Sequence, residues 1–171
     1  MKYRNDNDKC YGAAGMVIGL NVLGAEDTFG GVDINAEGLD CVRLLPEFLV
    51  ADQLTADAHD AWKKSVRHFQ VAMGLLIADR MSRKMLLDHG TVDHKMRQQM
   101  LSAMVTEGKV LCCLEQDEVQ RVFDEYFQHM VKVFSNPTVR TATSRLAQLI
   151  QERRALTSTE VEELLSELSV I

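Results

Sequence analysis

The sequence predicts a mainly α-helical fold, in which five to six helices pack around a long central helix at about residues 56–88. A small β element at about residues 15–45 is expected to cover one side. Apolar residues recur at three- and four-residue intervals through most of the chain after residue 56, which is the spacing of one helix face. The chain has two prolines, and seven of its ten glycines lie in the first forty residues. A chain of 171 residues is expected to form a single domain, residues 1–171.

The N-terminal part differs in character from the rest. Residues 1–9 are polar, and we expect them to be disordered. Between Gly15 and Leu45, alternating apolar residues predict two or three short strands joined by turns. The alternating residues are Met16, Ile18, Leu20 and Val22, followed by Val32, Ile34 and Ala36. For residues 11–25, a glycine-rich helix or loop is the alternative.

A short helix is expected to lead into the central one. Pro46 suits the first position of a helix that ends near Ala51, and Thr55 is the expected cap of the central helix. Residues 71–78 carry no charge on any side, which predicts that other elements surround the central helix there. Gly74 costs about 1 kcal/mol relative to alanine within a helix, and it indicates a close approach by another element. The apolar face consists of Trp62, Val66, Phe69, Met73, Ile77, Met81 and Met85.

The second half of the chain predicts four more helices. They are expected at about residues 93–107, 117–134, 138–155 and 157–171. Gly108 is expected to interrupt or end the first of them, and residues 109–114 then continue as helix or as a short connector, with helix favoured. Asn136 followed by Pro137 marks a helix boundary. Thr157 and Glu160 match the capping box at the start of the terminal amphipathic helix.

Charge and cysteine content restrict the classes of function. The net charge of −6 disfavours a dedicated nucleic-acid-binding protein. Four cysteines show no C-x-x-C spacing, which is typical of reduced, buried thiols in a cytoplasmic protein. The uncharged run at residues 11–25 is too short to span a bilayer, and the acidic residues before it disfavour a secretory signal. We therefore expect a cytoplasmic protein without a membrane partner.

One group of residues suggests a metal site. Asp88, His89, Asp93 and His94 lie at the exit of the central helix, and imidazole and carboxylate groups this close in sequence can supply ligands to a divalent ion. Their spacing matches no established metal motif. Solvated loop and capping residues are the alternative interpretation, so no cofactor is assigned and the metal remains a secondary hypothesis.

Other motifs are incomplete. Residues 33–38 resemble the first half of an EF-hand loop, but its twelfth position is Leu44 instead of glutamate. Cys112 and Cys113 are followed by acidic residues, which oppose the lowered pKa that a nucleophilic thiol requires. The glycines near the N-terminus lack the order of a phosphate-binding loop. Met96, Met100 and Met104 form a stripe that is typical of an adaptable core.

The remaining signal is charge segregation between the last two helices. The helix at 138–155 is basic and the helix at 157–171 is acidic, so the two either pair within the chain or leave a face for a partner. We expect a protein-interaction or regulatory module without its own catalysis, which binds another protein or a second copy of itself. The residues expected to bind are Val161, Leu164, Leu165, Leu168, Arg140 and Arg145. The alternatives are a metal-assisted enzyme and a nucleic-acid-associated regulator that reads phosphates through Arg140, Arg145, Arg153 and Arg154.

Overall fold

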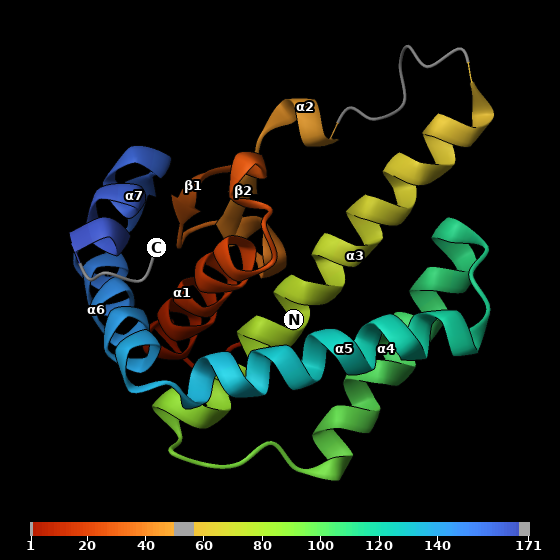
Figure 1. Ribbon diagram of the computed structural model, residues 1–171. Coiled ribbons are helices and arrows are strands. Elements are labelled where there is room, and N and C mark those ends of the chain that lie inside the picture. Colours follow the sequence, from red (N-terminus) through yellow and green to blue (C-terminus); the bar gives the residue numbers. More distant parts are fainter. Residues whose placement is uncertain (1, 50–56, 168–171) are drawn as a thin grey trace.

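The computed structural model describes residues 2–49 and 57–167, and it is mainly α-helical with a small antiparallel sheet (Figure 1). This confirms the predicted fold class. The helices are α1 (Asp6–Val22), α2 (Pro46–Leu49), α3 (Ala58–Ser82), α4 (His94–Cys112), α5 (Gln116–Ser135), α6 (Pro137–Arg153) and α7 (Ser158–Glu167). The strands are β1 (Phe29–Asp33), β2 (Val42–Leu44) and β3 (Ala155–Thr157).

The central helix has the predicted position. α3 continues into one π-helical turn, Arg83–Leu87, so that the two together run from 58 to 87. Asp57 caps α3 by accepting a hydrogen bond from the His59 amide, whereas the expected cap Thr55 lies outside the described residues. The segment around Gly74 is buried, and a Cβ atom built there would lie 2.2 Å from Cδ1 of Leu23. The predicted close approach at Gly74 is therefore made by the end of α1.

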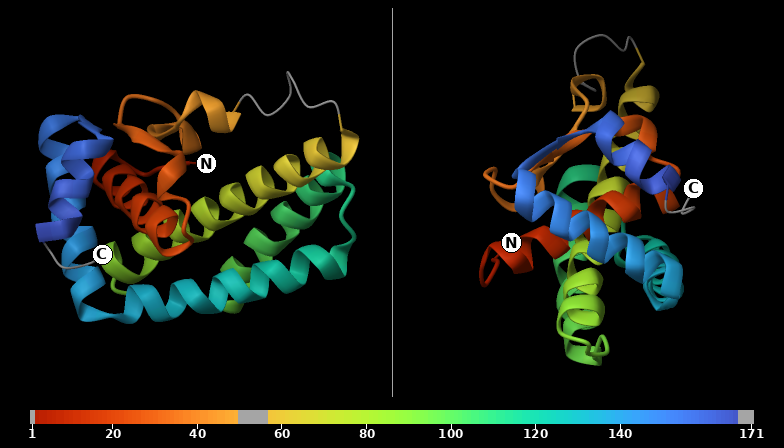
Figure 2. Two further views of the ribbon diagram at one scale, coloured as in Figure 1. Left: turned by 45° about the horizontal axis from the view of Figure 1, so that its top comes forward. Right: turned by 90° about the vertical axis from the view of Figure 1, so that its left-hand side faces the viewer.

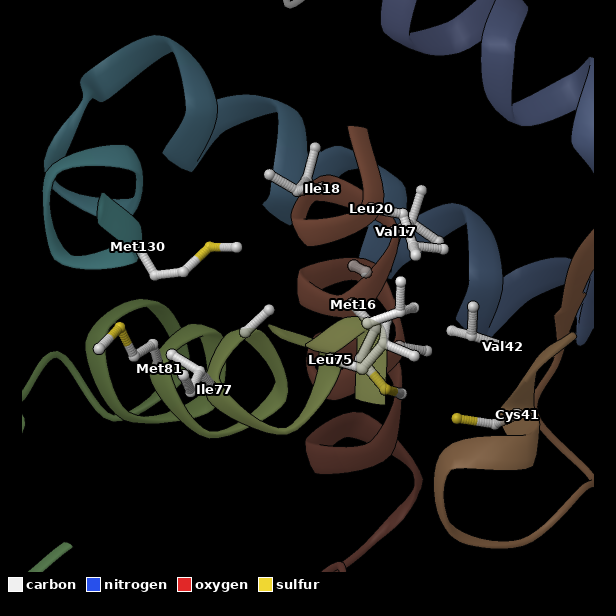
Figure 3. Close-up of a cluster of buried hydrophobic side chains, with 14 of the residues drawn as sticks. Met16, Val17, Ile18, Leu20, Cys41, Val42, Leu75, Ile77, Met81 and Met130 are labelled. Atoms are coloured by element: carbon white, nitrogen blue, oxygen red, sulfur yellow. The ribbon is translucent and has the colours of Figure 1, made fainter. Parts of the chain in front are cut away.

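The first long element is a helix where strands were predicted. α1 is buried along most of its length, and it crosses α3 and also contacts α6 (Figure 3). A helix that is apolar on every side has no 3.6-residue pattern, and glycines between larger residues imitated the alternation of a strand. Gly15 and Gly19 lie against Ser82 and Ala78 of α3. These small residues let the two helix backbones approach closely.

The expectation that residues 1–9 are disordered also differs from the structure. α1 begins at Asp6, and the Asn5 side chain accepts a hydrogen bond from the Asp8 amide at 2.9 Å. Arg4 makes ion pairs with Asp8 and Asp88, in both cases at 2.8 Å. The polar residues before the apolar run are thus the cap and first turn of a helix.

The sheet joins the two ends of the described chain. Its strand order is β2-β1-β3, with both pairs antiparallel. β3 occupies residues assigned by the sequence to the end of one helix and the start of the next. Gly31 makes this pairing possible, because its φ is +137° and a Cβ atom there would lie 2.7 Å from the Leu156 carbonyl oxygen.

The remaining helices wrap around this centre. α4 continues through Gly108 and ends at Cys112. A Cβ atom at Gly108 would lie 2.7 Å from Val119 and 2.8 Å from Phe69, so these two side chains occupy the space that a larger residue would need. Asn136 caps α6, with Pro137 at its start. α7 packs on β1, β3 and α6, while α4 and α5 lie on the other side of α1 (Figures 1 and 2). In the described part of the chain, no helix is both long and apolar enough to cross a membrane.

Candidate functional site

The clearest candidate site is an apolar surface at one end of the molecule, where the start of α3 meets the end of α4. Trp62, Val110 and Leu111 are 46%, 74% and 64% exposed. With Leu45, they are the exposed large hydrophobic residues of the described chain. Contiguous exposed apolar residues mark interaction surfaces more often than isolated ones do. We refer to Trp62, Val110 and Leu111 as the apolar end.

Hydrogen bonds hold the apolar end in place. The Trp62 indole N–H donates to the Cys112 carbonyl oxygen at 3.0 Å, and the Cys112 thiol donates to the Ser65 carbonyl oxygen at 3.4 Å. Cys113 then ends α4 with a left-handed φ of 55°. Trp62 is thereby tied to the last turn of α4, which carries Val110 and Leu111.

The charged residues near the apolar end have both signs. On α3, Lys63 lies 3.8 Å from Asp60, and the His59 ring stacks on Trp62 with a centroid distance of 6.3 Å. Near the end of α4, Lys109 and Glu115 are exposed. An apolar centre with a mixed polar rim is the usual organisation of a protein interface.

The predicted metal residues are not brought together. Arg4 binds Asp88, and Asp93 caps α4 by accepting a hydrogen bond from the Met96 amide at 2.7 Å. His89 has a left-handed φ of 50° in the loop, and His94 is the first residue of α4. Within residues 2–49 and 57–167, no group of three or more histidine, cysteine, aspartate or glutamate side chains is placed to hold a metal ion.

The predicted partner residues of α7 belong to the core. Val161 and Leu165 are both 1% exposed, and Leu164 is half-buried against the same cluster. Leu168 lies outside the described residues. The prediction that Val161 and Leu165 bind a partner is therefore corrected, because the apolar face of α7 packs on its own sheet and on α6.

Only part of the predicted basic face is available. Arg153 pairs with Glu160 at 2.7 Å, and Arg154 pairs with Asp6 at 2.5 Å. The first pair is the internal contact between the last two helices that charge segregation suggested. Arg140 and Arg145 are exposed on α6, where they line a shallow hollow of about 360 Å³. Two of the four arginines proposed to contact phosphates are thus engaged within the chain.

The thiols and the EF-hand-like segment show no reactive arrangement. Cys10, Cys41 and Cys112 are buried as predicted, but Cys113 is exposed. Burial raises the pKa of both Cys10 and Cys41 to about 11, and it also raises the pKa of Cys112. Asp33 binds Arg43 and accepts a hydrogen bond from the Asn35 amide. It is thus part of an ordinary turn.

Sequence reasoning missed a buried group of charges where α1 crosses α3. Arg83 binds Asp8 at 3.0 Å and Asp79 at 2.7 Å, and these two carboxylates are 1% and 0% exposed. The Tyr3 ring covers the guanidinium group of Arg83, 4.8 Å from its centroid. Asp79 and Arg83 are four residues apart at the end of the central helix, a spacing for an ion pair that was present in the sequence.

The two buried carboxylates have opposite pKa shifts. Burial raises the pKa of Asp79, and the nearby Arg83 offsets this only in part. Asp8 is also desolvated, but its hydrogen bonds from Arg4 and its pairing with Arg83 outweigh burial and lower its pKa. Asp79 Oδ1 has no hydrogen-bond partner of normal geometry among the described residues.

Comparison with known proteins found no matching family model, curated protein or solved structure.

Proposed function

We propose that this protein is an interaction module without catalysis of its own, which self-associates through the apolar end. The single observation that carries this proposal is the exposure of Trp62, Val110 and Leu111 where a hydrogen bond ties the start of α3 to the end of α4. Tryptophan is enriched among the residues that contribute most to binding at protein interfaces. We further propose a cytoplasmic location, which is supported by four free cysteines, three of them buried.

A second copy of the chain is the proposed occupant. A two-fold interface places the same patch on both subunits, so a basic side chain on one copy can meet an acidic one on the other. The rim satisfies this requirement, because Lys63 and Asp60 lie on α3 while Lys109 and Glu115 lie near the end of α4. A purely acidic or purely basic rim would instead repel its own copy.

Light scattering after size-exclusion chromatography tests this proposal. The wild-type protein is expected to increase in mass as its concentration rises through the micromolar range. Val110→Glu with Leu111→Glu should leave a monomer at every concentration, because buried unpaired carboxylates oppose association. Ser102→Glu is the matched control, since Ser102 is exposed on α4 away from the apolar end, and it should behave as wild type. A wild-type monomer throughout, or equal masses for all three proteins, would refute the proposal.

A further inference from the structure

A cleft of about 830 Å³ lies between the start of α1, the loop at 37–40, α3 and α4. This is within the size range of ligand-binding clefts. The cleft is distinct from the apolar end. It requires its own explanation, because its lining combines an apolar floor with charged walls.

The floor of the cleft lies along the seam between α3 and α4. Ala72 and Leu76 of α3 face Ala103 and Met104 of α4. A smaller hollow of about 80 Å³ continues along the same seam, and it shares Leu76 and Ala103 with the cleft. The floor can therefore receive an apolar side chain, and the methionines beside it can adapt to its shape.

The cationic groups of the cleft are mostly engaged within the chain. Lys9 donates a hydrogen bond to the Ala36 carbonyl oxygen at 2.5 Å and lies 5.9 Å from the Tyr3 ring centroid. Arg80 lies 3.9 Å from Asp79. Lys2 is exposed and has no ion pair with another described residue.

The carboxylates of the cleft are mostly unpaired. Asp6 is bound by Arg154, but Glu37, Asp40 and Glu107 form no ion pair with any residue that the structure describes. Three carboxylates without an ion pair therefore stand against two ammonium groups without one, those of Lys2 and Lys9. The charge that is available to a ligand is negative.

We propose that this cleft binds a segment of a partner protein in which an apolar side chain is flanked by lysine or arginine. The apolar side chain lies on the floor between α3 and α4, and the flanking cations meet Glu37, Asp40 and Glu107. Charge complementarity selects this partner, because an acidic segment would add to the unpaired negative charge of the cleft. The proposal is independent of self-association, since no residue of the apolar end lines the cleft.

Fluorescence anisotropy at low ionic strength tests the charge requirement. The probe is a labelled peptide of two leucines with two lysines on either side, and wild-type protein is expected to bind it saturably. Glu37→Gln, Asp40→Asn and Glu107→Gln together should weaken binding by about tenfold or more, because the negative charges that attract the peptide lysines are lost. The control combines Glu152→Gln, Glu162→Gln and Glu163→Gln. It changes the net charge equally, from −6 to −3, at exposed positions outside the cleft, and it should bind as wild type.

A second variant tests the apolar floor. Ala103→Trp retains every charge and fills the floor from an exposed position, so it should also weaken binding by about tenfold, with an unchanged melting temperature. Equal binding by the cleft and control variants would show attraction to net charge only and would overturn the proposal. Saturable binding of a peptide with glutamates in place of the lysines, or no saturable binding to wild type, would also overturn it.

Discussion

Arg83 is the residue on which the buried charges depend. It binds two carboxylates that are almost completely removed from solvent, and a buried charge without a partner strongly destabilises a fold. Asp8 accepts hydrogen bonds from a second arginine, Arg4, whereas the second arginine near Asp79, Arg80, lies 3.9 Å from its carboxylate. This difference in partners explains why neighbouring aspartates have pKa values shifted in opposite directions.

Substitution of these two aspartates should therefore give opposite pH dependences. The pKa of Asp8 is lowered, so its stabilising contribution is present above the unfolded value of about 3.9 and is lost as pH falls through the folded value. The pKa of Asp79 is raised, so its contribution is present below about 3.9 and is lost as pH rises through the folded value. As pH rises from about 3 to 7, the free energy of unfolding of wild type should increase relative to Asp8→Asn and decrease relative to Asp79→Asn. Urea unfolding at several pH values measures both differences, and slopes of the same sign would contradict the assignment.

Gly74 should tolerate a side chain only if Leu23 is shortened. A Cβ atom at Gly74 would lie 2.2 Å from Leu23 Cδ1, so Gly74→Leu should lower the free energy of unfolding by about 1–3 kcal/mol. In the Leu23→Ala background the same change should cost less, because space has been vacated. Urea unfolding of the four proteins gives this coupling as a double-mutant cycle. A Gly74→Leu protein with the melting temperature of wild type would show that α1 does not pack closely there.

At the scale of whole elements, α7 covers the sheet by packing on β1 and β3, and it also packs on α6. The sequence showed that α7 is amphipathic but not what its apolar face meets. β3, which precedes it, pairs with β1. Such long-range pairing has no local pattern, and for this reason the docked position of α7 could not be predicted.

Truncation of the buried face of α7 should therefore affect stability. Leu165→Ala is expected to lower the free energy of unfolding by about 2–5 kcal/mol, because it leaves a cavity at a position that is 1% exposed. Glu162→Ala, on the exposed side of the same helix, should change it by less than about 0.5 kcal/mol. Thermal unfolding followed by circular dichroism compares the two variants. Equal, small effects would indicate that α7 is not packed on the domain.

At the scale of the whole molecule, periodicity and capping residues predicted the elements that have one buried face. The central helix, α5, the boundary at Asn136 and the capping box of α7 were all found as expected. α1 was not, because a helix buried on every side has no one-sided pattern. The apolar end and the cleft depend on which helices meet, and neither is encoded in any single stretch of sequence. That the chain forms a single domain stays a prediction.

The burial of α1 has a consequence for the synthesis of the protein. α1 leaves the ribosome before α3 and α6, the two helices that cover it, and α6 ends at Arg153. The final strand of the sheet comes later still. The side of α1 that α6 covers must therefore stay exposed until residue 153 has been made. Chains that expose apolar surface before they fold are prone to aggregate, so this protein is most prone to aggregate before α6 has emerged from the ribosome.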